Sequence, residues 1–226
     1  MKLGVLFSGG KDSTIALHKA SKKNKIACLI TIISKNKESY MFHTPNINIT
    51  QLQSEALGIP IINKDTKGNP EEELTDLEEA IKQAIEKFKI KGIVTGAIAS
   101  VYQSQRIQKI CDKLDILCIN PLWNKNQKSI MFQMVNKKYK TIISGIFAYP
   151  LTKKWLGKTI DNETINQLII LNKKFGLSIA GEGGEIETTV LDAPLFTKKI
   201  EITDFTVKEK GNTGVFTINS AHLEKK

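Results

Sequence analysis

The chain has 226 residues, 41% of them hydrophobic, so it can bury one large core or two modest ones. No uncharged apolar run of about 18 residues occurs, and the N-terminal MKLGVLF leads directly into a motif, so we expect a cytoplasmic protein with neither a membrane span nor a signal peptide. The net charge of +10 would suit a nucleic acid, but the excess is scattered lysine, Arg106 is the sole arginine and only 7% of residues are aromatic, which disfavours nucleic-acid binding.

Short apolar strands alternate with helical patterns over the first half of the chain. The expected strands span residues 2–7, 26–33, 59–63, 92–98 and 116–120. The helical patterns between them span residues 12–22, 49–58, 69–89 and 100–114. This alternation indicates an α/β fold with a doubly wound parallel sheet, covered on both faces. Ligands of such sheets bind beyond the carboxyl ends of the strands, where the strand order reverses.

The motif SGGKDS, Ser8 to Ser13, follows the first strand and precedes the first helix. A glycine-rich turn at such a place commonly binds phosphate. It is not a Walker A loop, because that loop needs a glycine where Val5 stands and a serine or threonine where Asp12 stands. We therefore expect it to bind phosphate in another manner than the P-loop hydrolases do.

The residue types within this motif suit a bound pyrophosphate. Gly9 and Gly10 have no side chains, so backbone N–H groups can close on an anion. We expect Asp12 or Ser13 to cap the following helix, whose dipole points at the same place. Lys11 adds a point charge, and Asp12 could alternatively hold Mg²⁺. The alternative is a plain Gly-Gly turn before a capped helix.

The segment SYMFHTPN, residues 39–46, follows the second strand. Backbone groups at the end of that strand could bind an adenine, and Met41 and His43 could pack on its face. His43 is equally well explained as an ordinary capping or core histidine.

A second loop, TGAIAS, follows the fourth strand at the expected switch point. Gly96 permits close approach there, and Ser100 can cap the next helix. That helix carries Tyr102, Gln103 and Arg106 on one face. Arginine in a chain that otherwise uses lysine suggests a planar, bidentate contact with phosphate or carboxylate, and the alternative is a solvated helix residue.

The pattern changes after NPLW, residues 120–123, which suggests one domain over residues 1–123 and a smaller α+β domain over residues 124–226. The second domain is expected to contain helices at 127–139 and 161–176, a strand at 141–149 and a hairpin of strands 198–210 and 213–223. Its unusual segment, residues 180–196, places Glu182, Glu185 and Glu187 among three glycines. By itself such a segment is typical of a solvated turn.

These motifs together resemble a known family. SGGKDS is similar to the PP-loop, S-G-G-x-D-S, of the N-type ATP pyrophosphatases, which cleave ATP between the α and β phosphates and have an adenine nucleotide alpha hydrolase-like fold. With SYMFHTPN, GAIASVYQSQRIQKIC, NPLW and GEGGEIETTVLDAP, the chain resembles the diphthine–ammonia ligases, which catalyse the last step of diphthamide synthesis.

The resemblance implies a mechanism. ATP would bind across the two loops with Mg²⁺, the diphthine carboxylate would attack the α phosphorus, and ammonia would then displace AMP from the acyl-adenylate. Lys11 and backbone amides would bind pyrophosphate, and Arg106 would steady the α phosphate. The three glutamates would hold the cationic substrate or orient ammonia, namely Glu182, Glu185 and Glu187. The implied partner protein is elongation factor 2 that carries diphthine, and the implied co-substrate is ammonium. Whether the chain forms a homo-oligomer is not predicted.

Two alternatives remain at this point. A tRNA-modifying PP-loop enzyme would also use ATP and would exploit the positive charge. Many of those that insert sulfur need paired cysteines near the ATP loop, whereas Cys28, Cys111 and Cys118 form no CxxC pair, and with three histidines they assemble no zinc motif. A nucleotide-binding regulatory module without catalysis is disfavoured by intact Lys11 and Asp12.

Overall fold

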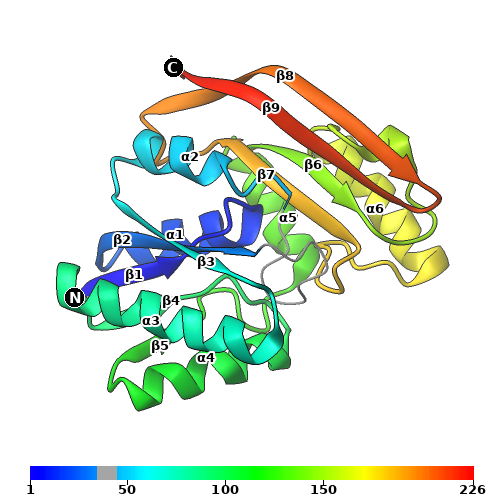
Figure 1. The fold of residues 1–226 in the computed structure, drawn as a ribbon. Helices are drawn as coiled ribbons and strands as arrows, with labels where there is room; N and C mark the ends of the chain where they lie inside the picture. Colours follow the sequence, from blue (N-terminus) through cyan, green and yellow to red (C-terminus); the bar gives the residue numbers. More distant parts are fainter. Residues whose placement is uncertain (35–44) are drawn as a thin grey trace.

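The computed structural model describes residues 1–34 and 45–226, and these residues form two sheets (Figure 1). The first sheet is parallel, with the strand order β3-β2-β1-β4-β5. Its strands are β1 (Lys2–Leu6), β2 (Lys25–Ser34), β3 (Ile61–Thr66), β4 (Gly92–Val94) and β5 (Leu117–Ile119). The order reverses beside β1, so the loops after β1 and β4 border the switch point. The predicted doubly wound α/β fold is confirmed.

Helices cover both faces of the parallel sheet. Those of the first half are α1 (Lys11–Ser21), α2 (Ile49–Leu57), α3 (Pro70–Phe88) and α4 (Val101–Lys113). α3 and α4 lie below the sheet in Figure 1, where Leu77 and Ile107 share a buried cluster with Ile30 of β2. α1 lies on the opposite face, and α2 packs against the second sheet. Within the described ranges, no helix has the length and apolarity needed to cross a membrane.

Strand β4 is shorter than its sequence pattern predicts. The apolar run predicted a strand to residue 98, but β4 ends at Val94. The next residue, Thr95, hydrogen bonds through its hydroxyl to Asn120, which follows β5 and donates to Ser104 of α4 at 3.3 Å. The N–H of Thr95 still donates to the carbonyl of Ile119 (3.0 Å), and beyond this bond the chain turns away from the sheet to form a loop.

The second sheet is antiparallel, with the strand order β7-β6-β9-β8. Its strands are β6 (Lys140–Ile146), β7 (Ile186–Asp192), β8 (Lys198–Lys210) and β9 (Thr213–Lys225). Its helical elements are α5 (Gln127–Asn136), α6 (Asn162–Phe175) and the single 3₁₀ turn η1 (Lys153–Trp155). The predicted hairpin is confirmed as β8 and β9, whereas β7 was not predicted, because the sequence pattern gave only a glycine-rich segment there.

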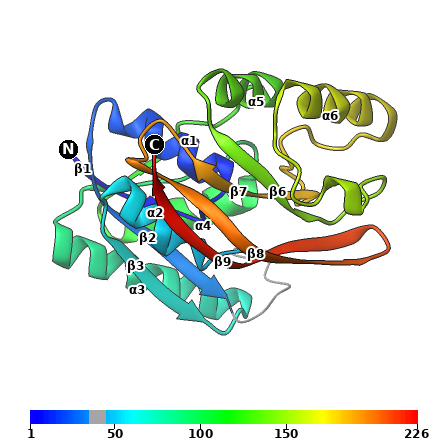
Figure 2. The ribbon, with the colours of Figure 1, turned by 90° about the horizontal axis from the view of Figure 1, so that it is seen from above.

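The two halves of the chain share one hydrophobic cluster. It contains Leu3 and Val5 of β1 together with Ile143 of β6 and Val190 of β7, all completely buried. Figure 2 shows the second sheet lying beside α1 and α2. The domain boundary between residues 123 and 124 stays a prediction, but the halves are not packed as separate cores.

Asn46 fastens the segment before α2 to the second sheet. Its Nδ2 donates to the carbonyl of Phe216 (2.9 Å) and to the hydroxyl of Thr189 (3.3 Å), and its Oδ1 accepts the N–H of Ile218 (2.7 Å). Its φ of 66° is a left-handed conformation that asparagine tolerates well. The amide therefore bridges β7 and β9 from the first half of the chain.

Asn46→Asp tests this bridge, because it keeps the shape but replaces the donating amide nitrogen with an oxygen that faces the carbonyl of Phe216. We expect the free energy of unfolding to fall by about 1–3 kcal/mol. Urea unfolding measures the change, with Asn212→Asp in the exposed hairpin turn as the control. Equal stability of the two variants would contradict the structural role of Asn46.

Candidate functional site

The loop between β1 and α1 opens the site. Helix α1 begins at Lys11, and its N-cap is Gly10, so the predicted capping by Asp12 or Ser13 is wrong. The hydroxyl of Ser13 instead donates back to the carbonyl of Gly10 (3.1 Å), as does that of Thr14 (2.8 Å). With no side-chain N-cap, and with the N–H of Lys11 donating to Thr188, the N–H groups of Asp12 and Ser13 are left to bind an anion.

Close contacts within the protein explain the two glycines of the loop. Gly9 has a φ of 76°, and a Cβ there would collide with the amide of Gln53 on α2. A Cβ on Gly10 would lie 3.2 Å from the carbonyl oxygen of Thr188 on β7. Ser8, beside them, lies 3.3 Å from Ser13 through the two hydroxyls. The glycines therefore let α2 and β7 approach the loop, in addition to exposing its backbone.

Lys11 and Asp12 form an ion pair at the start of α1. The Nζ of Lys11 lies 2.7 Å from Oδ2 of Asp12, and the Lys11 side chain is only 4% exposed. The other oxygen of Asp12, Oδ1, is buried and has no hydrogen-bond partner among the described residues. One carboxylate oxygen is thus available to a cation, while the neighbouring ammonium can neutralise an anion.

Two of the three predicted glutamates meet this ion pair. Burial raises the pKa of Glu182, and Asp12 raises it further, while the N–H of Ala99 at 2.9 Å and the charge of Lys11 oppose the shift. Burial raises the pKa of Glu187 to about 7, although Lys11 opposes this shift and Asp12 adds to it. Both carboxylates are therefore within electrostatic reach of Lys11 and Asp12.

The third glutamate, Glu185, is turned toward its own loop. Its two carboxylate oxygens accept the N–H groups of Ser178 (3.0 Å) and Gly183 (2.9 Å). The hydroxyl of Ser178 in turn accepts the N–H of Glu182 (2.9 Å). Glu185 thus shapes the glycine-rich loop that presents Glu182, and its carboxylate is engaged there.

The loop after β4 packs directly on the start of α1. A Cβ on Gly96 would lie 2.8 Å from the carbonyl carbon of Asp12 and from the backbone nitrogen of Ser13, so only glycine fits without movement. Ser100 is the N-cap of α4, and its hydroxyl accepts the N–H of Gln103 (3.4 Å), so the predicted cap is confirmed.

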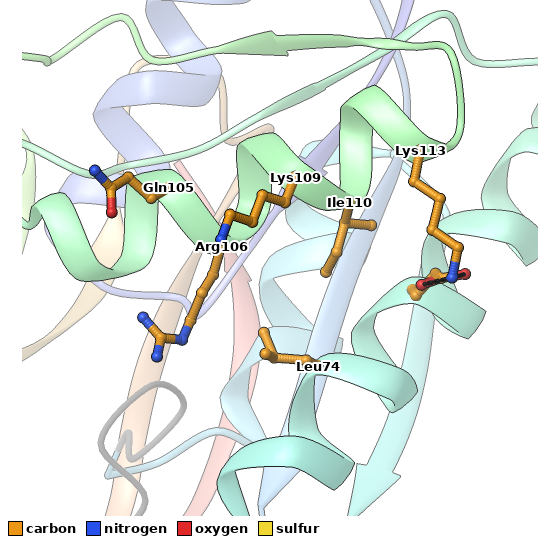
Figure 3. A pocket seen from close by; sticks show the side chains of 7 residues that line it. Leu74, Gln105, Arg106, Lys109, Ile110 and Lys113 are labelled. Atoms are coloured by element: carbon orange, nitrogen blue, oxygen red, sulfur yellow. Dashed lines mark hydrogen bonds and ion pairs between the residues drawn. The ribbon is translucent and has the colours of Figure 1, made fainter.

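Arg106 lies beside Tyr102, on the side of α4 that faces α3. Its guanidinium stacks 3.3 Å from the centroid of the Tyr102 ring. With Leu74 of α3 and Lys109 of α4, it lines a cavity of about 360 Å³ between these two helices, as Figure 3 shows. Its predicted contact with the α phosphate stays a prediction. Met41 and His43 lie outside the described residues, so the adenine contacts also stay a prediction.

Sequence reasoning missed the residues that join the loop to β7. The hydroxyl of Thr188 accepts the N–H of Lys11 (3.1 Å), and the N–H of Val190 donates to the carbonyl of Gly9 (3.0 Å). From α2, the side-chain amide of Gln53 donates to the carbonyl of Gly9 in the loop and to the carbonyl of Val190 on β7. Gln53 shares the buried face of α2 with Ile49 and Ala56, but Thr50 and Ser54 are buried there too, so its polarity alone did not single it out.

Comparison with known proteins agrees with the sequence resemblance. Residues 1–118 match the family model described as diphthamide synthase N-terminal domain, and residues 126–223 match the model of its C-terminal domain. The diphthine–ammonia ligase of Mus musculus is 34% identical over 222 residues, which cover 89% of this chain and 83% of that protein. That of Homo sapiens is 33% identical over 220 residues, covering 88% and 82%.

Similarity to solved structures is weaker. A predicted subunit of tRNA methyltransferase from Methanocaldococcus jannaschii is 20% identical, covers 86% of this chain and 98% of its own, and gives a TM-score of 0.45. A 4-thiouridine synthetase in complex with RNA and ATP is 16% identical, covers 84% and 55%, and gives a TM-score of 0.40. Both scores are too low to bear on function.

Glu187→Gln is expected to stabilise the ligand-free protein at high pH. Because the pKa of Glu187 is raised above its ordinary value, the folded state holds this proton more tightly than the unfolded state does. Wild-type stability therefore falls as the pH rises through about 7, and the glutamine variant lacks this loss.

Thermal melting at pH 4 and pH 8 checks this sign. The gain in melting temperature from Glu187→Gln should be larger at pH 8, whereas Glu86→Gln, on the exposed side of α3, should show no such difference. Parallel pH profiles for wild type and Glu187→Gln would show that Glu187 is solvated like an ordinary glutamate.

Proposed function

The chain belongs to the diphthamide synthase family, and from this membership and the site we propose that it is an ATP-dependent ligase that amidates diphthine with ammonium. ATP is its substrate and is converted to AMP and pyrophosphate. The observation that carries the proposal is the position of Lys11 and Asp12 at the start of α1, where the N–H of Lys11 donates to Thr188, the residue after Glu187 on β7. A phosphate-binding loop and an acidic loop thereby face one another in a single site.

The phosphate side of the site suits the first step. The diphthine carboxylate attacks the α phosphorus, the bond from that phosphorus to the bridging oxygen breaks, and pyrophosphate leaves. The uncapped N-terminus of α1 and the ammonium of Lys11 stabilise the charge that develops on this leaving group. We expect Lys11 to turn from Asp12 to the phosphate, which would couple phosphate binding to a change of partner for Asp12.

Mg²⁺ fits the residues that are present. Oδ1 of Asp12 lacks a partner, and magnesium binds proteins through one or two carboxylates together with substrate phosphates. Among the described residues, no group of three or more acidic, histidine or cysteine side chains could hold a metal ion. Bound there, the ion would neutralise phosphate charge during the attack.

The acidic side of the site suits the second step. Diphthine carries a quaternary ammonium, and the co-substrate is ammonium, so carboxylates nearby would hold both cations. Ammonium first loses a proton to solvent, the resulting ammonia attacks the acyl carbon of the adenylate, AMP leaves, and the nitrogen loses a second proton as the amide forms. Glu187, whose pKa is raised to about 7, can accept that proton near neutral pH.

The protein partner in this proposal is elongation factor 2 carrying diphthine, which places the enzyme in the cytoplasm.

The cysteines give little support to the alternative function, a tRNA-modifying enzyme. Burial raises the pKa of Cys28 to about 12, which makes it a poor nucleophile. Cys111 lies in α4 and Cys118 in β5, where the Cys118 thiol helps to raise the pKa of Cys111, but both are on the sheet face away from α1.

Product analysis tests the proposed reaction. We expect AMP and pyrophosphate in equal amounts when the protein receives ATP, Mg²⁺, ammonium and elongation factor 2 bearing diphthine. Chromatography of the nucleotides with a coupled pyrophosphate assay measures them, and unmodified tRNA in place of the elongation factor is the control. ADP with inorganic phosphate, or pyrophosphate release that depends on tRNA, would refute the proposal.

Lys11→Met should lower the rate of pyrophosphate release by about 100- to 1,000-fold, because it removes a charge from the developing anion in a buried place. The methionine fills similar space, so the melting temperature reports whether folding is intact. Lys22→Met, at the exposed end of the same helix, is the control. Unchanged turnover in Lys11→Met would assign Lys11 a role in folding only.

A further inference from the structure

Gln53 of α2 is completely buried between the loop after β1 and strand β7. Its Nε2 donates to the carbonyl of Gly9 (2.9 Å) and to the carbonyl of Val190 (2.7 Å). One amide group therefore holds the backbone of two segments that are 181 positions apart in the sequence, positions 9 and 190.

The two segments also bind each other directly. The N–H of Val190 donates to Gly9 at 3.0 Å, and the N–H of Lys11 donates to the hydroxyl of Thr188 at 3.1 Å. The loop thus lies against β7 along a short hydrogen-bonded seam. Glu187 immediately precedes Thr188 on that strand, so the seam determines where Lys11 stands relative to Glu187.

The chemistry of the amide explains why glutamine stands here. Its NH₂ group supplies two donors at a fixed angle, and two carbonyl oxygens face it. An apolar side chain of the same length would leave the buried carbonyl of Val190 without this donor, and Gly9 would lose one of its two. The other end of the amide occupies the space that a side chain at Gly9 would need.

Resting on the proposed function, we propose that Gln53 is a positioning residue for amide formation: by tying Gly9 to Val190, it fixes the pyrophosphate-binding loop against the strand that bears Glu187. It touches neither substrate. Adenylation uses mainly the loop, whereas attack of ammonia on the adenylate uses both sides of the seam. A misplacement of about 1 Å can cost about 100-fold in rate, so loosening the seam should harm the second step most.

Gln53→Met removes both donors at nearly constant volume, and Gln53→Asn keeps the amide but is one methylene too short to reach. Gln51→Met, on the exposed side of the same helix, is the matched control. For both Gln53 variants we expect kcat for amide formation to fall by about 10- to 100-fold with the KM for ATP changed by less than about threefold. More AMP should appear per amide formed, because the adenylate has time to hydrolyse.

A second measurement needs no substrate. Hydrogen exchange of the ligand-free proteins should be faster in residues 8–14 and 186–192 of the Gln53 variants and unchanged in Gln51→Met. The proposal would be overturned if folded Gln53→Met had normal kcat, normal amide yield and normal exchange. A lower melting temperature with unchanged kinetics and exchange would overturn it as well. If the wild type amidates no diphthine-bearing protein, the proposed function fails, and the exchange rates of residues 8–14 and 186–192 still decide whether Gln53 positions the loop.

Discussion

The seam between the loop after β1 and strand β7 is the contact on which the site depends. It joins a phosphate-binding turn in the parallel sheet to an acidic strand in the antiparallel sheet through the N–H groups of Lys11 and Val190. The parallel sheet contributes Lys11 and Asp12 to this place, and the antiparallel sheet with its glycine-rich loop contributes Glu187 and Glu182. Because these hydrogen bonds are mostly buried, a small shift of either sheet would change the position of Lys11 relative to Glu187.

Packing explains how the seam can persist. β1, α1, β6 and β7 contribute to one hydrophobic cluster, so separating the sheets would expose apolar surface as well as break hydrogen bonds. The same buried setting raises the pKa of Glu182 and Glu187 and leaves Oδ1 of Asp12 without a partner. Buried carboxylates of this kind lower the stability of the folded protein and can bind cations, a combination that is common at functional sites.

The sequence predicted those features that arise from local chemistry. The apolar strand before SGGKDS, the alternation of strands and helices, and the cap at Ser100 all follow from neighbouring residues. The start of α1 was misjudged, because the hydroxyl of Ser13 binds the preceding carbonyl instead of capping. Contacts between distant segments could not be predicted: nothing near Thr188 indicates that it accepts the N–H of Lys11, 177 positions away. The contacts of Glu185 with Ser178 and Gly183 are local, but they depend on the conformation of a glycine-rich loop, which the residue types alone did not indicate.

The central claim is that ATP lies across the seam, with its phosphates between α1 and the acidic strand. A crystal structure with Mg²⁺ and α,β-methylene ATP, which cannot release pyrophosphate, tests it most directly. The account predicts the β phosphate at the N-terminus of α1, Lys11 moved from Asp12 onto that phosphate, and the α phosphate facing Glu187. Phosphates bound in the cavity beside Arg106, with Lys11 still paired to Asp12, would contradict it.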